Sequence, residues 1–64
     1  MFNETTYLQK IIEREAKTTL YLMNGVQLHG TILDADQETI LFYCEGTNQM
    51  IYKHAISTVK TKNV

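Results

Sequence analysis

The first quarter of the chain carries hydrophobic residues at a helical spacing. Apolar side chains recur so that they lie on one side of an α-helix, at Tyr7, Leu8, Ile11 and Ile12. Asn3 is a suitable N-cap for that helix, because its side-chain oxygen can accept a hydrogen bond from an amide of the first turn. The pattern predicts a helix over about residues 4–16.

From residue 18 the composition shifts to β-branched and aromatic residues, which favour strands. Five strands are predicted, over about residues 18–23, 26–35, 38–44, 48–52 and 55–59. The residues after them, 60–64, are expected to form a short loose tail. Residues 1–64 are therefore expected to make one domain.

Three glycines punctuate the predicted strands. Asn24-Gly25 indicates a hairpin with a type I′ turn, in which both central residues need a positive φ. Gly46 and the polar residues after it indicate a second turn. Gly30 lies inside the long second strand, where a residue without a β-carbon permits a sharp bend. A helix followed by five short, bent antiparallel strands predicts a mainly β fold, a small SH3-like barrel.

The length of the chain limits how stable one copy can be. A domain of 64 residues buries only about 60% of the surface that its unfolded chain exposes. Small domains are usually reinforced by disulfides, a metal or assembly. Cys44 is the only cysteine, and His29 and His54 lie far from it in sequence, so neither an intrachain disulfide nor a zinc motif is expected. No cofactor is predicted, and oligomerisation is the remaining means of stabilisation.

The charges are nearly balanced, with six Lys and Arg against seven Asp and Glu. Phosphate binding depends on local cations, and Lys53, Lys60 and Lys62 make the C-terminal part basic. The longest apolar run, residues 40–44, is too short to span a bilayer, so a cytoplasmic protein with no membrane contact is expected. No activated nucleophile, carboxylate pair or phosphate-binding glycine loop is evident, and the chain is not expected to be an enzyme.

Two segments resemble the Sm motifs of Hfq, the bacterial Sm-like RNA chaperone family. Residues 22–30 (LMNGVQLHG) are similar to the first motif, and residues 49–58 (QMIYKHAIST) are similar to the second. Asp36 stands where the family has an acidic residue after the bent strand. The resemblance covers about residues 7–59 and implies the Sm-like form of the small barrel.

The resemblance also implies a ring of six subunits, in which an edge strand of one copy pairs with an edge strand of the next. Closing a ring in this way removes unpaired strand edges. Tyr52 and Ser57 stand at positions that the family uses in the subunit interface, although either side chain can also pack or cap within its own subunit.

Family members bind uridine-rich RNA at the pore, on the side of the ring that carries the helix. Gln37, Lys53 and His54 match residues used there. Two positions depart from the family, because Glu38 replaces a base-stacking aromatic ring and Glu4 replaces a glutamine. Stacking on a ring contributes about 1–3 kcal/mol per base, so uridine binding is expected to be weak.

On the opposite, distal face, Tyr21, Gly25 and Val26 match a family pocket in which purines stack. Polar candidates for contacts with the base edges are Gln27, His29, Asn48, Gln49 and Thr58. Each of these could instead be an ordinary exposed strand residue.

The sequence thus predicts a ring that binds A-rich single-stranded RNA on its distal face, with small regulatory RNAs and mRNAs as candidate partners in post-transcriptional regulation. The alternative is a divergent relative that has kept the assembly but acts through protein contacts or as a partner in mixed rings. Tyr21, Lys53 and His54 favour the first function, whereas Glu4 and Glu38 favour the second.

Overall fold

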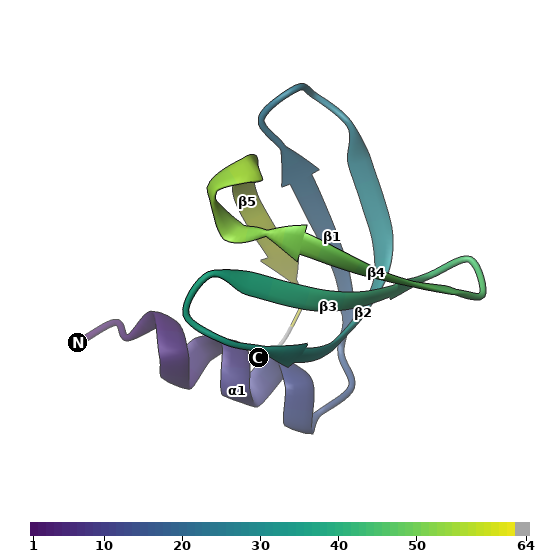
Figure 1. The fold of residues 1–64 in the computed structure, drawn as a ribbon. Coiled ribbons are helices and arrows are strands. Elements are labelled where there is room, and N and C mark those ends of the chain that lie inside the picture. Colours follow the sequence, from purple (N-terminus) through teal and green to yellow (C-terminus); the bar gives the residue numbers. More distant parts are fainter. Residues whose placement is uncertain (63–64) are drawn as a thin grey trace.

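The computed structural model describes residues 1–62, which form one N-terminal helix and a five-stranded antiparallel sheet (Figure 1). The elements follow the chain in the order α1 (Glu4–Glu13), β1 (Lys17–Leu22), β2 (Gln27–Ala35), β3 (Thr39–Cys44), β4 (Thr47–Tyr52), a 3₁₀ turn (Lys53–Ala55) and β5 (Ile56–Thr61). The strands are arranged in the order β4-β3-β2-β1-β5, so β4 and β5 are the two edges of the sheet. The predicted barrel of five bent strands with one helix is confirmed.

The helix begins and ends with defined caps. The Asn3 side chain accepts a hydrogen bond of 3.1 Å from the Thr6 amide, which confirms it as the N-cap. At the other end the amides of Glu15 and Ala16 donate to the carbonyls of Ile12 and Ile11. These two bonds form a Schellman motif, in which Glu15 takes the left-handed position with a φ of 49°. The prediction of a helix to residue 16 was wrong, because this motif ends it three residues earlier.

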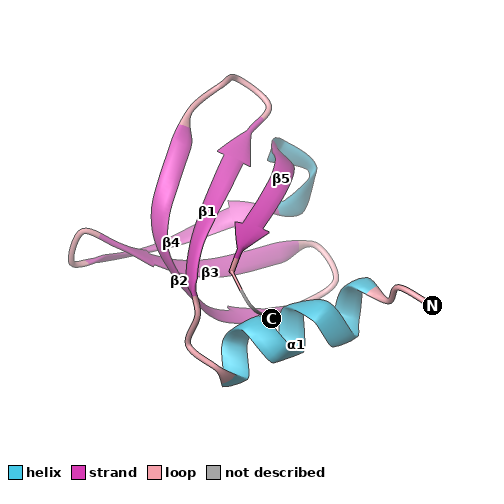
Figure 2. Cartoon of the chain, turned by 180° about the vertical axis from the view of Figure 1, so that it is seen from behind, coloured by secondary structure: helices cyan, strands magenta, loops and turns pink. Residues whose placement is uncertain are grey.

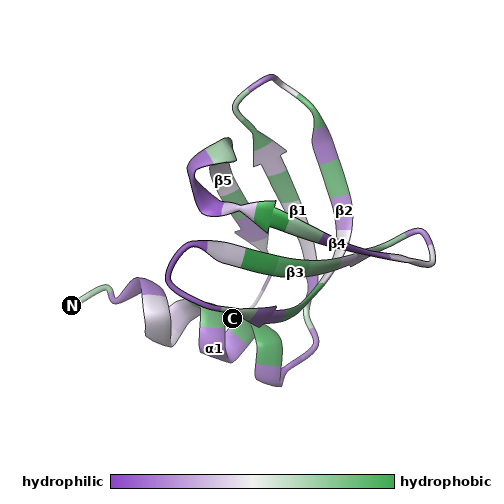
Figure 3. Ribbon diagram, in the orientation of Figure 1, coloured by the Kyte–Doolittle hydropathy of each residue, from purple (hydrophilic) through white to green (hydrophobic). Residues whose placement is uncertain are grey.

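Apolar residues from the helix and from four of the strands meet in one core. Hydrophobic and hydrophilic positions alternate along the first part of β2, whereas β3 carries a continuous hydrophobic stretch (Figure 3), and α1 lies across one end of the sheet. The largest fully buried side chains are Ile11, Leu20, Ile32, Ile40 and Phe42. Leu8 and Ile11 are the buried residues of α1, so the predicted apolar side of the helix closes the sheet at that end.

The sheet bends most tightly along β2. Gly30 lies so close to β3 that a β-carbon added there would overlap the carbonyl oxygen of Tyr43 and press against the ring of Phe42. The pairing of β2 with β3 then shifts register between Ile32 and Asp34, a bulge that increases the bend. Gly30 is therefore required for close approach of two backbones, in agreement with the predicted bend.

Two hairpins differ from the turns that the sequence predicts. Between β1 and β2, Gly25 has a positive φ of 92° but Asn24 does not, and four residues, 23–26, separate the two strands. The Gly25 amide donates to the Leu22 carbonyl, and the Leu22 amide donates to the Val26 carbonyl. The prediction of a type I′ turn at Asn24-Gly25 was therefore wrong, because the connection is longer than two residues and only Gly25 takes a positive φ.

The two-residue turn with two positive φ angles lies instead between β3 and β4. Glu45 has a φ of 51° and Gly46 a φ of 78°, and Cys44 pairs directly with Thr47. Thr47 and Asn48 consequently belong to β4 rather than to the turn.

The last strand is longer than predicted. β5 continues to Thr61, whose hydroxyl lies 2.9 Å from the hydroxyl of Tyr7 on α1. Lys60 and Thr61 pair with Thr19 and Thr18, so the expected loose tail over residues 60–64 was wrong for its first two residues. Its last two residues lie outside the described part of the chain. Within residues 1–62, no helix is both long and apolar enough to cross a membrane.

We expect Gly30→Ala to lower the free energy of unfolding by about 1–3 kcal/mol, because the new methyl group has no room against β3. Urea denaturation at one fixed protein concentration measures this loss. Gly46→Asn is the control, since no atom lies within 4 Å of an added β-carbon and Asn tolerates a positive φ. Equal stability of Gly30→Ala and wild type would contradict the close approach.

Candidate functional site

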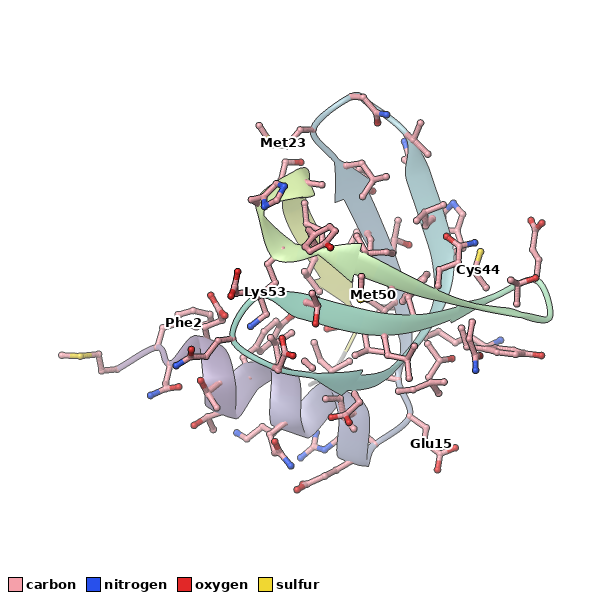
Figure 4. The ribbon with its side chains drawn as sticks, viewed as in Figure 1. Phe2, Glu15, Met23, Cys44, Met50 and Lys53 are labelled. Atoms are coloured by element: carbon pink, nitrogen blue, oxygen red, sulfur yellow. The ribbon has the colours of Figure 1, made fainter. Side chains whose placement is uncertain are left out.

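Lys53, one of the predicted pore residues, is held in an ion pair on the helix side of the molecule. Its ammonium group lies 2.9 Å from a carboxylate oxygen of Glu4, and its side chain is 22% exposed. Figure 4 shows Lys53 close to the N-terminal end of α1, on the same side as Phe2. The backbone amide of Lys53 also donates to the Glu38 carbonyl. The two sequence positions that depart from the family pattern are therefore both bonded to Lys53.

A groove of about 440 Å³ lies between α1 and the loop after β2, and it is lined by Gln37, Lys53 and Glu4. Asp36 shapes that loop. One of its carboxylate oxygens accepts hydrogen bonds from the Thr39 hydroxyl, the Glu38 amide and the Thr39 amide, at 2.7–2.9 Å. The Thr39 hydroxyl contributes most to lowering the pKa of Asp36, followed by the Glu38 and Thr39 amides, with a smaller contribution from the charge of Lys53. An ionised Asp36 thus fixes the position of Gln37 and Glu38.

His54 is not among the residues that line this groove. It lies in the 3₁₀ turn, and its ring stacks on Tyr52 with 5.4 Å between centroids and 12° between planes. Tyr52 is half exposed, so the stacked pair presents aromatic surface to solvent. Within one chain, Gln37 and Lys53 come together, whereas His54 pairs with a predicted interface residue.

The predicted distal residues gather around Tyr21 on the sheet. The register of the strands places Tyr21 opposite Gln27 of β2 on one side and opposite Thr58 of β5 on the other. Side chains that face each other across antiparallel strands have β-carbons about 4.5–5.5 Å apart. The three residues therefore form a row, called the Tyr21 row below. The hydroxyl of Ser57, a predicted interface residue, donates to the Tyr21 carbonyl within the same chain.

Gly25 and Val26 belong to the hairpin loop beyond this row. Val26 is 45% exposed, and its amide donates to the Asn24 side chain. Met23, in the same loop, is 69% exposed and lies far from α1 in Figure 4. The loop thus adds apolar surface at the end of the sheet opposite the helix.

His29 lies two residues along β2 from Gln27, on the same side of the strand. Its ring nitrogen is 3.0 Å from the hydroxyl of Thr19, the residue opposite it on β1. Thr19 was not among the predicted site residues, although the alternation of β1 places it on the same face as Tyr21. The Glu4–Lys53 ion pair was also missed, because the two residues are 49 positions apart.

Asn48 and Gln49 are not brought to Tyr21 within one chain. Both lie on β4, which β3 and β2 separate from β1 in the sheet. Successive residues of a strand point to opposite faces, so their side chains also point away from each other. Asn48 is exposed and opposite Tyr43, whereas Gln49 is half-buried and opposite Phe42.

The described residues hold no group of three or more His, Cys, Asp or Glu side chains suited to a metal ion. Cys44, the one cysteine, is buried. The predicted pore and distal residues that the fold does bring together, Gln37 with Lys53 and Tyr21 with Gln27 and Thr58, are at least partly exposed. That arrangement is suited to binding an extended partner through surface contacts.

Comparison with known proteins agrees with this architecture. The family model described as Hfq protein matches residues 4–64. RNA-binding protein Hfq from Bacillus thuringiensis (strain Al Hakam) is 49% identical over 59 residues, which are 91% of this chain and 80% of the relative. The protein of the same name from Bacillus cereus (strain B4264) has the same identity and coverage.

Solved structures give the same result. A crystal structure of the pleiotropic translational regulator Hfq superposes with a TM-score of 0.86 and 30% identity, covering 88% of this chain and 93% of that one. An Hfq protein from Anabaena sp. has a TM-score of 0.82 at 24% identity over 91% of this chain and 93% of its own, which supports the fold.

The helix and the bent five-stranded sheet define an Sm-like protein. More narrowly, the chain belongs to the Hfq family, as the family match over residues 4–64 and the 49% identity to curated members show. The resemblance in the two Sm motifs is thereby confirmed. Membership of this family also supports the expectation that the chain is not an enzyme.

Proposed function

We propose that the chain assembles into a ring that binds A-rich single-stranded RNA on the face of the Tyr21 row, and that it acts as an RNA chaperone in post-transcriptional regulation. The Tyr21 row is the observation that carries this proposal, because an aromatic ring lies between two polar side chains that can reach the edges of a base. Base stacking on the ring supplies affinity, and Gln27 and Thr58 supply hydrogen bonds. The curated relatives carry the name RNA-binding protein.

The edges of the sheet support assembly. β4 and β5 each have a neighbour on one side only, and an unpaired strand edge favours pairing with another chain. β4 also exposes Met50 (Figure 4) and Tyr52, at 58% and 50%. Pairing β4 of one copy with β5 of the next is a heterologous contact, which closes into a ring when the rotation between copies fits. We propose six copies, with Tyr52 and Ser57 at the contact.

The helix side is less suited to RNA. Lys53 already pairs with the carboxylate of Glu4, so its charge is partly neutralised before any phosphate arrives. Glu38 adds a second carboxylate in the turn that Asp36 fixes, beside Gln37. Both features oppose binding of a polyanion at Gln37, Lys53 and His54. Uridine binding there is therefore proposed to be weak.

A second function is favoured by the same ion pair. If the helix side does not bind RNA, the ring can still present a surface for proteins or include copies of another family member. The Glu4–Lys53 pair is the specific observation for this alternative, because it satisfies the one lysine that lines the groove on the helix side.

We expect the purified protein to have about six times the mass of one chain in light scattering, because the exposed edges need partners. A folded monomer at micromolar concentration would contradict the ring. Met50→Glu is a second test, because it places a charge on the exposed apolar surface of β4 and should shift the measured mass toward smaller species.

Tyr21→Ala should weaken binding of oligo-A by about 1–3 kcal/mol for each occupied pocket, because it removes the stacking surface. Fluorescence anisotropy at fixed salt measures the change. Tyr21→Phe is the matched control, since it keeps the stacking ring and should bind oligo-A as wild type does. If Tyr21→Ala binds oligo-A as well as wild type does, the RNA-binding proposal loses its main site and the protein-contact alternative is preferred.

Glu4→Gln with Glu38→Phe should tighten binding of oligo-U, because the first change releases Lys53 and the second provides a ring for stacking. The expected gain is about 1–3 kcal/mol for one stacked base. Adding Lys53→Ala to the same variant should reverse part of the gain. Unchanged oligo-U affinity in all of these variants would show that RNA does not enter the helix side.

A further inference from the structure

A second groove, of about 710 Å³, lies on the outer side of the sheet and is larger than the groove beside α1. Its walls come from the start of β1, the end of β5, the middle of β2, and the end of β3 with the turn after it. Three lysines line it, Lys17, Lys60 and Lys62, together with the ring of Tyr43. Figure 2 shows β1 and β5 side by side, with the start of β1 and the end of β5 both toward α1.

The charges of the chain are distributed unevenly between this groove and the rest of the molecule. It holds three of the six Lys and Arg but, among residues 1–62, only Glu45 of the seven Asp and Glu. The groove therefore carries a local charge of +2, and the rest of the chain carries −3. A polyanion is attracted by the local cations that reach it, so the total charge of −1 does not prevent binding here.

The groove continues directly from the Tyr21 row. Thr19 lies next to Tyr21 on the same face of β1, and it is opposite His29 on one side and Lys60 on the other. Lys17 is the next residue on that face, about 6.7 Å further along the strand. An extended ligand that leaves Tyr21 toward α1 therefore passes hydroxyl and imidazole groups and then reaches the lysines.

Tyr43 adds an aromatic surface to the lysine end. It is 45% exposed and lies opposite Thr31, which in turn lies opposite Lys17. Cationic groups along a groove combined with an exposed ring are the features that bind single-stranded nucleic acid without sequence preference. A ligand that carries negative charge but no base would gain little binding energy from an aromatic ring.

We propose that the groove at Lys17, Lys60 and Lys62 binds the phosphate backbone of single-stranded RNA, with Tyr43 stacking on one base. The proposal rests on the proposed function, since it extends the RNA beyond the Tyr21 row toward the helix end of the sheet. Each bound strand then gains phosphate contacts that the Tyr21 row alone does not provide.

The salt dependence of oligo-A binding tests the lysines, because each phosphate contact to a single strand contributes about 0.7 to the slope of log K against log salt. Lys60→Gln and Lys17→Gln should each make the slope shallower by about that amount. Lys10→Gln is the matched control, since Lys10 is an exposed lysine on α1 outside the groove, and its slope should equal that of wild type. Tyr43→Ala should weaken binding at least about fivefold with an unchanged slope.

An abasic oligonucleotide of the same length separates this proposal from the function it rests on. It carries phosphates but no bases, so it should bind weakly at low salt, lose affinity in Lys60→Gln and be unaffected by Tyr21→Ala. If oligo-A binds and responds to Tyr21→Ala while both lysine variants keep the wild-type slope, the groove is overturned and the proposed function stands. If Tyr21→Ala leaves the affinity for oligo-A unchanged while Lys60→Gln weakens binding of the abasic strand, the proposed groove is supported and the purine pocket is rejected. Absence of binding by both strands rejects both.

Discussion

The contact between Gly30 and the backbone of Tyr43 is the constraint on which the rest of the structure depends. Because no β-carbon separates them, β2 and β3 approach closely and the sheet bends enough for one short helix to close its end. The order of the strands leaves β4 and β5 as the two edges of this bent sheet. A flat sheet of these strands would bury less apolar surface, and a chain of 64 residues has little to spare.

The order and register of the strands decide which residues share a surface. The row of Gln27, Tyr21 and Thr58 depends on β1 lying between β2 and β5, an arrangement that brings together residues more than thirty positions apart. Alternation along a strand shows that Gln27 and His29 share a face, so this part of the site could be predicted from the sequence. It does not show that Thr58 faces Tyr21, because register between distant strands is set by the whole sheet.

The errors in predicting local structure have a common cause. The end of a helix is easiest to predict where a glycine follows it. Here Glu15 takes the left-handed conformation instead, so the end of α1 was predicted too late in the chain. Asn-Gly is the strongest signal for a type I′ turn, yet that turn lies at Glu45-Gly46. In both places a glutamate takes a positive φ, a conformation that residue propensity alone does not anticipate. The long periodic elements, in contrast, were predicted correctly to within a few residues.

The distribution of charge explains why composition is a poor guide to what this chain binds. Judged by the number of cations alone, the helix side and the sheet would be expected to bind a polyanion equally well. Lys53, however, lies 2.9 Å from a carboxylate oxygen of Glu4. Lys60 of β5, in contrast, lies opposite the neutral Thr19 of β1. An ammonium group that already has a carboxylate partner gains less from a phosphate, because binding must first break that pair. Under the proposed function, the same residue type therefore favours RNA on the sheet and disfavours it beside the helix, and this difference arises from contacts that the linear sequence does not reveal.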